Sequence, residues 1–203
     1  MKIIYSNNIL NRIVICLFII ILPCSIISCS SSNNRTNEDK YAIEKKRIQE
    51  EFKQKINSLD TIYITKDLFM GMTKQSYQKA VKNLNKKIAL RIDKFKYKVD
   101  SPKFDDNKEL VQLTLVSDEY DCQDSYSVNA LKTNASTITQ FLASTYGDPH
   151  KTAPDISGLE FFNLDNKWFF DSLYINTKTG IRYDPDGWAF QRIEILYSRP
   201  KFK

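Results

Sequence analysis

The feature that most constrains the fold is a succession of strand-like segments in the last third of the chain. The tetrapeptide Asp184-Pro-Asp-Gly187 is a strong turn signal because each of its residues favours a tight turn. It separates two predicted strands, Ile181–Tyr183 and Trp188–Tyr197, and aromatic residues, which favour strands, are concentrated in this region. Two further strands are predicted at Glu160–Phe162 and Trp168–Ile175.

The middle of the chain predicts one helix followed by two strands. Thr73 suits a helix N-cap after Gly71, and an apolar face then predicts a helix over about 73–86. Residues 88–99 read as a strand with a bulge or break near Asp93, where the apolar phase shifts. Val111, Leu113 and Leu115 alternate with polar residues and predict a half-buried strand, and Thr61–Thr65 is a short strand candidate.

A second helix is predicted before the late strands. Asp118–Asn129 reads as a polar loop, so the helix is expected to open at Asn134 or Ser136. Gly147-Asp148-Pro149 should end it, since glycine permits a left-handed cap and proline cannot continue a helix. The side chains expected to point inward are Ala135, Ile138, Phe141, Leu142 and Thr145.

These elements form an approximate repeat, in which a helix is followed by strands twice. We expect an α+β domain over residues 60–203, made of two helix-plus-strand units at 60–120 and 130–200. The strands are not separated often enough by helical crossovers for a parallel sheet. The prediction is therefore an antiparallel sheet with helices on one face, preceded by an amphipathic helix.

The N-terminus resembles that of bacterial lipoproteins. Lys2 and Arg12 precede an apolar run, Ile13–Leu22, that has signal-peptide length and is short for a membrane span. Ile26-Ile27-Ser28-Cys29 then resembles a lipobox, in which the cysteine is acylated and becomes the first residue of the mature chain. The resemblance implies a signal peptide over 1–28 and a lipid anchor at Cys29 (diacylglycerol and palmitate). An uncleaved anchor and an ordinary signal peptide are the alternatives.

Two segments lie between the lipobox and the domain. Residues 29–37 are small and polar, which is typical of a flexible tether. Residues 38–59 are dense in charge and carry one narrow apolar seam at helical spacing, formed by Ile48, Phe52, Ile56 and Leu59. This amphipathic helix is expected to dock on its own domain, and a solvated spacer or a partner-binding coiled coil remain alternatives.

The chain also resembles small outer-membrane lipoproteins of the SmpA/OmlA (BamE-like) type and the helix-plus-sheet repeats of beta-lactamase inhibitor proteins. The residues that carry this resemblance are Gly71-Met72-Thr73-Lys74 as a helix opener, Gly147-Asp148-Pro149 as a helix closer, and Cys29. The resemblance implies a periplasm-facing or surface-exposed lipoprotein that binds protein and is not an enzyme. Attachment to the outer membrane is the expected location.

The sequence contains no constellation that identifies a reaction. His150 is the one histidine, and it is expected to be exposed on a loop. The acidic cluster Asp118, Glu119, Asp121 and Asp124 could hold calcium but lacks the glycine and terminal glutamate of an EF-hand. Glu160 and Asp165 could be the paired carboxylates of a glycosidase. A hydrolase is the least favoured hypothesis, and we expect no catalytic residue, no metal and no cofactor.

Composition bears on the partners. Removing residues 1–28 lowers the formal charge from +6 to about +4, which does not point to nucleic acid. Acylation of Cys29 would leave Cys122 as the other cysteine, so no disulfide framework is expected, and a reactive or dimer-forming thiol is the alternative. The expected partners are the lipid bilayer and another envelope protein. The alternative function is glycan binding, with Trp168 and Trp188 as stacking residues.

Overall fold

The computed structural model describes residues 34–84, 87–152 and 161–200. The chain divides after Ala42 into two compact units, and the fold described below belongs to the second, Ile43–Lys203. The predicted signal peptide and lipobox lie outside the described residues, as do positions 29–33 of the predicted tether. Positions 34–37 of that tether are instead the start of helix α2 (Asn34–Asn57), so the prediction of a flexible tether is wrong there. No helix among the described residues is long and apolar enough to cross a membrane.

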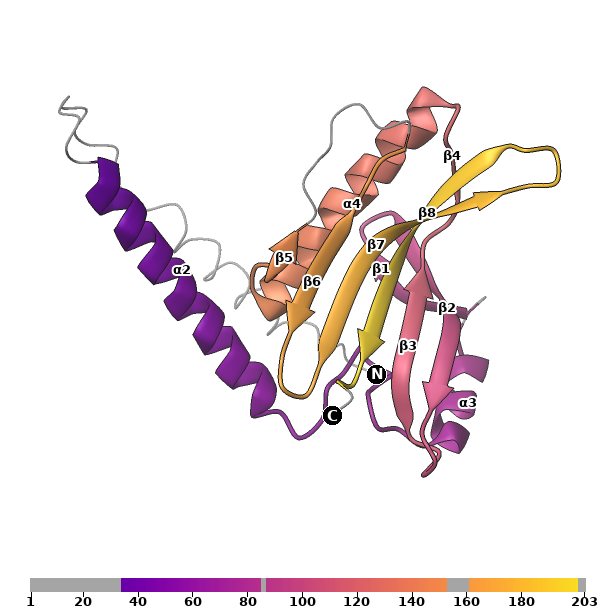
Figure 1. Ribbon diagram of the computed structural model, residues 1–203. Helices are drawn as coiled ribbons and strands as arrows, with labels where there is room; N and C mark the ends of the chain where they lie inside the picture. The colour runs from indigo at the N-terminus through magenta and orange to yellow at the C-terminus, as the bar shows by residue number, and fades with distance from the viewer. Residues whose placement is uncertain (1–33, 85–86, 153–160, 201–203) are drawn as a thin grey trace, which may run out of the picture. The chain divides into compact units, whose positions relative to one another are not determined.

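The second unit is an α+β domain built on one antiparallel sheet, as predicted (Figure 1). The strand order is β1-β2-β3-β8-β7-β6-β5, and β4 pairs with β8 beside this path. The strands are β1 (Ile88–Ile92), β2 (Phe95–Phe104), β3 (Leu110–Val116), β4 (Tyr120–Asp121), β5 (Lys151–Thr152), β6 (Asp165–Phe169), β7 (Tyr174–Tyr183) and β8 (Ala189–Ser198). Because β3 pairs with β8, the strands of the two predicted units join in one continuous sheet.

The helices α3 (Lys74–Lys82) and α4 (Ser125–Tyr146) both pack on one face of this sheet, behind the strands in Figure 1. Along β8 every second side chain is buried, from Ala189 to Tyr197, and those between are partly exposed. The largest wholly buried side chains are Trp168, Tyr97 and Tyr197. One face of the sheet therefore carries the core, and the other faces solvent.

The helix ends follow the sequence closely at two of the predicted positions. Thr73 is the N-cap of α3, and its side-chain oxygen accepts a hydrogen bond from the Ser76 backbone amide at 3.2 Å. Gly147 ends α4 with a φ of 79°, a conformation that costs glycine little. Both predictions are confirmed.

Other boundaries were predicted wrongly. Helix α4 begins at Ser125, about nine residues before the predicted start, because Asp124 accepts hydrogen bonds from the amides of Tyr126 and Ser127 and caps it. The polar stretch 118–129 is thus partly helical. Thr145 is exposed instead of pointing inward.

Two expected single strands are instead pairs of strands joined by a turn. The break predicted near Asp93 is a tight turn between β1 and β2, with Asp93 at a φ of 54°. Likewise the predicted strand 168–175 turns at 170–173 and belongs to both β6 and β7. Thr61–Thr65 forms no strand of the sheet, only an isolated bridge from Tyr63 to Phe69, and Phe162 is not in a strand.

The amphipathic helix is present as α2 (Asn34–Asn57). In its second half Ile56 is buried in the core, and Phe52 packs where a side chain on Gly147 would lie. Asn57 exchanges hydrogen bonds with Asp171 at 2.8 and 3.1 Å. The end of α2 from Phe52 onward therefore docks on its own domain, whereas Ile48 remains 41% exposed.

Candidate functional site

The most prominent surface feature is the end of the β7–β8 hairpin, which extends beyond the rest of the sheet (Figure 1). Strand β6 pairs with β7 only up to Lys178, and β3 pairs with β8 only from Glu194 onward. Beyond these points β7 and β8 continue to pair with each other as far as Tyr183 and Ala189. We call residues 179–193 the projecting hairpin.

The tip of the projecting hairpin is held by the predicted turn. The backbone amide of Asp184 donates to the Trp188 carbonyl at 3.0 Å, and the Gly187 amide donates to the Asp184 carbonyl at 3.0 Å. The Asp184 carboxylate accepts from the amides of Asp186 and Trp188 at 3.0 and 2.8 Å. Gly187 has a φ of 85°, which explains the glycine at this position. The turn is thus well ordered by local hydrogen bonds.

An ion pair holds the hairpin to the neighbouring segment. Arg182 donates two hydrogen bonds to Glu119, at 2.8 and 2.7 Å, and its guanidinium lies 5.1 Å from the centre of the Phe190 ring. The hydrogen bond from Arg182 holds the pKa of Glu119 below its usual value. Strand β4 adds two more paired positions along β8. These contacts stiffen the hairpin without covering its tip.

Three large hydrophobic side chains of the projecting hairpin remain exposed. Ile181, Tyr183 and Trp188 have 48%, 61% and 46% of their surface accessible. Ile181 and Tyr183 are two residues apart in one strand and so project from the same face. By the same alternation Trp188 lies on the face of Phe190 and Arg182. The hairpin therefore presents apolar groups on both faces.

The two tryptophans predicted to stack on a ligand are not brought together. Trp168 is wholly buried, and its indole N–H donates to the Gly147 carbonyl oxygen at 2.7 Å. This corrects the prediction for Trp168, because a residue in the core offers no ring face to a ligand. Trp188 is half exposed on the hairpin, and no described residue accepts a hydrogen bond from its indole N–H. The sequence showed two aromatic residues in strands and could not show which face each one occupied.

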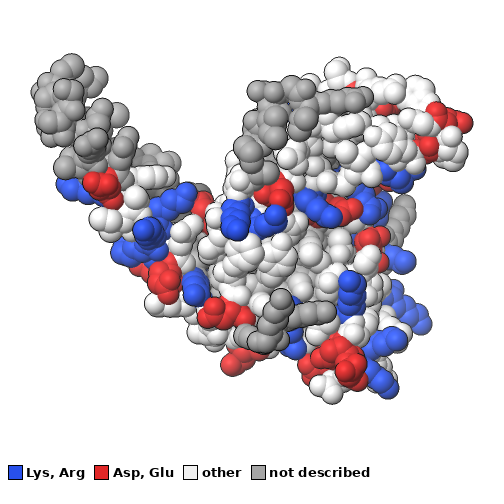
Figure 2. Space-filling view, in the orientation of Figure 1, with Lys and Arg blue, Asp and Glu red and all other residues white. Residues whose placement is uncertain are grey.

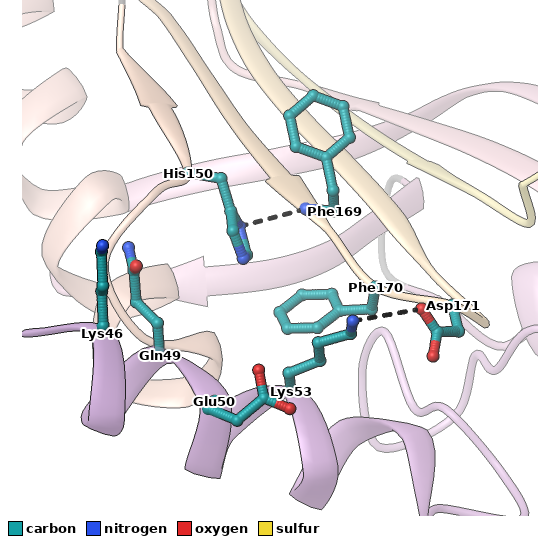
Figure 3. A pocket seen from close by; sticks show the side chains of 8 residues that line it. All are labelled: Lys46, Gln49, Glu50, Lys53, His150, Phe169, Phe170 and Asp171. Atoms are coloured by element: carbon teal, nitrogen blue, oxygen red, sulfur yellow. Dashed lines mark hydrogen bonds and ion pairs between the residues drawn. The ribbon is translucent and has the colours of Figure 1, made fainter.

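A second surface feature is a groove of ≈ 510 Å³ between α2 and the end of β6 (Figure 3). Helix α2 contributes four polar side chains, and the opposite wall is formed by His150 and the segment 169–171. Its lining residues are Lys46, Gln49, Glu50, Lys53, His150, Phe169, Phe170 and Asp171. Lys53 lies 3.7 Å from Asp171 across the groove, so part of its charge is already balanced within the chain.

His150 is held in this groove by the backbone of Phe169. Its Nδ1 accepts a hydrogen bond from the Phe169 amide at 3.2 Å, and its ring meets the rings of Phe169 and Phe170 edge-on. Burial, followed by the charge of Lys53, lowers the pKa of His150 below its usual value. With Nδ1 accepting this hydrogen bond, the ring helps to position β6 at Phe169, and no nucleophilic side chain among the described residues is bonded to it.

The four acidic residues considered for calcium have separate partners. Asp118 lies 2.6 Å from the Lys98 ammonium, and Glu119 pairs with Arg182. Asp121 accepts from the Gln123 amide, and Asp124 caps α4. No group of three or more metal-binding side chains occurs within residues 34–84, 87–152 and 161–200.

Of the two carboxylates considered for glycoside hydrolysis, Glu160 lies outside the described residues. Asp165 lies 2.6 Å from the Lys167 ammonium, and its other oxygen accepts from the Asn176 amide at 2.7 Å. Burial alone would raise the pKa of Asp165, but these two hydrogen bonds lower it below its usual value. An aspartate held ionised in this way is poorly suited to donate a proton.

No family model matches this chain, and no curated protein and no solved structure matches it. The resemblance to lipoproteins of the SmpA/OmlA type therefore stays a prediction. The candidate site rests on the geometry of the projecting hairpin.

Proposed function

We propose that this protein is a membrane-anchored envelope lipoprotein, acylated at Cys29, whose α+β domain binds another envelope protein without catalysing a reaction. The observation that carries the binding role is the exposure of Ile181, Tyr183 and Trp188 on the projecting hairpin. Large aromatic side chains at an exposed, ordered position are typical of interface hot spots.

The shape of the projecting hairpin supports its insertion into a groove of the partner protein. Apolar side chains lie on both of its faces, so a flat partner surface would cover only one of them. The turn and the Arg182–Glu119 pair hold the hairpin in place before binding. Little conformational entropy would then be lost on association, which favours tight binding.

The charges at the tip narrow the chemistry of the partner. Asp184 and Asp186 are the acidic residues of the turn, and Asp184 already has its carboxylate engaged by backbone amides. Asp186 carries no ion pair among the described residues. An apolar groove with a basic rim would complement this tip, because opposite charges across an interface speed association and exclude other partners.

The anchoring part of the proposal is tested separately. Acyl chains each add about 0.8 kcal/mol per buried CH₂, so the lipidated form should be stably membrane-bound. A Cys29→Ser variant is expected to leave the membrane fraction. If it remains there, the lipobox interpretation is wrong.

The binding part is tested by site-specific photo-crosslinking in intact envelopes. A photoreactive residue replacing Tyr183 should give one defined protein adduct. The matched control replaces Tyr126, which is 80% exposed at the start of α4 and outside the projecting hairpin. Equal crosslinking from both positions, or none from Tyr183, would contradict the proposal.

Affinity for the crosslinked partner, once purified, then tests the hot spot. Trp188→Ala should weaken binding by about 2 kcal/mol, or roughly 30-fold, as for a central interface tryptophan. Tyr126→Ala should leave affinity unchanged. Glycan-array binding that disappears in Trp188→Ala, with no protein adduct, would favour the glycan-binding alternative instead.

A further inference from the structure

The positive charge of the chain is concentrated in one segment. Residues 74–103 contain ten Lys or Arg residues and two Asp residues, a net charge of +8. The whole chain has a net charge of +6, so the rest of it sums to −2. Composition alone therefore understates how basic one part of the molecule is.

This segment folds as α3, β1 and β2, at one end of the sheet. Figure 2 shows basic side chains gathered along the side of the molecule that α3 and β2 occupy. We call this end of the domain the basic face. It wraps around the edge of the sheet, because Lys96 and Lys98 alternate with the buried Phe95 and Tyr97 and so lie on the side opposite α3. Its described cations, of which all but Lys96 and Lys98 are largely exposed, are Lys74, Lys79, Lys82, Lys87, Arg91, Lys94, Lys96, Lys98 and Lys103.

Almost none of these charges is balanced within the described part of the chain. Lys98 pairs with Asp118 at 2.6 Å, and the other eight cations of the basic face have no ion pair there. Elsewhere the domain does pair its charges, as in Lys167–Asp165 and Arg192–Glu194. The basic face is thus an uncompensated positive field, which would attract an anionic partner.

We propose that the basic face lies against the anionic headgroups of the bilayer in which the protein is anchored. This rests on the membrane attachment in the proposed function. Lysine predominates over arginine, and lysine acts as a flexible point charge without the fork geometry that reads a single phosphate. A layer of diffuse negative charge fits such side chains better than a defined phosphate pocket does.

The same surface lacks what single-stranded nucleic acid needs. Among the described residues, every exposed large hydrophobic side chain lies outside positions 64–125. Tyr77, Phe95 and Tyr97 of this region are buried. Bases would therefore find no aromatic platform on which to stack.

The short segment between Cys29 and the domain makes even a weak attraction between the basic face and the headgroups effective. Thirteen residues lie between Cys29 and Ile43, so the domain begins at most ~50 Å from the anchor. The anchor keeps the local concentration of headgroups high, and each lysine close to an anionic leaflet strengthens attraction by about fivefold. A second signal of this kind commonly accompanies a lipid anchor.

The test is amine-acylation footprinting of the full chain reconstituted in lipid vesicles, read by mass spectrometry. Lys79, Lys82 and Lys94 should react severalfold more slowly on vesicles that contain phosphatidylglycerol than on pure phosphatidylcholine. The protection should disappear at roughly 1 M salt, where the Debye length falls to about 3 Å. Lys132, exposed on α4, is the internal reference and should not change.

Matched variants sharpen the result. In Lys79→Gln/Lys82→Gln/Lys94→Gln, the remaining Lys96 and Lys103 should lose their protection. In the control Lys45→Gln/Lys132→Gln/Lys151→Gln, which removes the same charge elsewhere, Lys96 and Lys103 should keep it. Equal reactivity on both vesicle types, or equal protection of Lys132, would overturn the proposal.

Two further arms distinguish a lipid surface from nucleic acid and from self-association. If the lysines are protected only when duplex RNA is added to neutral vesicles, the proposal is overturned in favour of nucleic acid. If they are protected on neutral vesicles in proportion to the protein concentration, it is overturned in favour of a second copy of this chain. Flotation with neutral vesicles reports the anchor independently. A chain that does not float there lacks the anchor, and flotation with anionic vesicles then tests the basic face by itself.

Discussion

Replacing the buried tryptophan provides the sharpest test of the division between core and binding surface. Trp168 is 0% exposed, and its indole N–H is bonded to the Gly147 carbonyl at 2.7 Å. Trp168→Phe keeps an aromatic ring but removes this donor. The Gly147 carbonyl would then be buried without a partner, at a cost of about 1–3 kcal/mol.

The smaller ring also leaves space. A cavity of roughly 40 Å³ costs about 1 kcal/mol at about 24 cal/mol per Å³. Together these effects predict that Trp168→Phe lowers the free energy of unfolding by about 2–4 kcal/mol. The site cannot relax easily, because Ile175, which pairs with Trp168, and Tyr197, which pairs with Ile175, are also buried.

Urea unfolding of the full chain, followed by far-ultraviolet circular dichroism, measures this change. The midpoint should fall while the slope stays constant. Trp188→Phe is the matched control, and it should change stability by less than about 0.5 kcal/mol, since Trp188 is 46% exposed. A loss below about 1 kcal/mol in Trp168→Phe would refute the reasoning, as would equal losses in the two variants.

Three further predictions concern the groove, the helix cap and the hairpin turn. The pKa of His150 is lowered in the folded state by burial and by Lys53, so its neutral form contributes stability above pH 6.5 that is lost as the pH falls below that value. His150→Gln should therefore flatten the dependence of the unfolding free energy on pH below 6.5. Lys53→Met should raise the pKa of His150, measured by NMR. Asp124→Ala should destabilise the domain by about 1 kcal/mol through loss of the α4 cap, whereas Asp186→Ala should be neutral in the same unfolding assay. Gly187→Ala should cost about 1–2 kcal/mol because position 187 has a φ of 85°, which is strained for alanine. A new Cβ would meet no atom within 4 Å, so the cost would come from the backbone alone. An unchanged stability would mean that the turn relaxes freely.

Much of the secondary structure could be predicted from local signals. Thr73, Gly147 and the turn 184–187 act through their own backbone neighbours, so their roles are visible without the fold. The α4 start was missed because Asp124 stood in an acidic, polar stretch that also suits a loop. The β1–β2 turn was missed because a phase shift in a strand looks the same whether the chain bulges or reverses.

The candidate site was predictable only in part. The strand-rich aromatic region singles out Trp188 as a stacking residue, but the same pattern predicts no more than strand residues at Ile181 and Tyr183. Their exposure depends on where β3 and β6 stop pairing with the hairpin, at Glu194 and Lys178. Such long-range pairing leaves no local trace in the sequence.

The sequence by itself determined the α+β class, the antiparallel order of the late strands and the total charge, because these follow from periodicity, turn chemistry and composition. It also supplied the predicted lipid anchor at Cys29, which lies outside the described residues. Only the tertiary structure decided which aromatic residues are core and which are surface. Packing of α4 against the sheet buries Trp168, whereas Trp188 follows the hairpin turn on the face of the partly exposed Phe190. Likewise only the fold brings the cations of α3, β1 and β2 to one end of the sheet, because proximity in space depends on strand pairing.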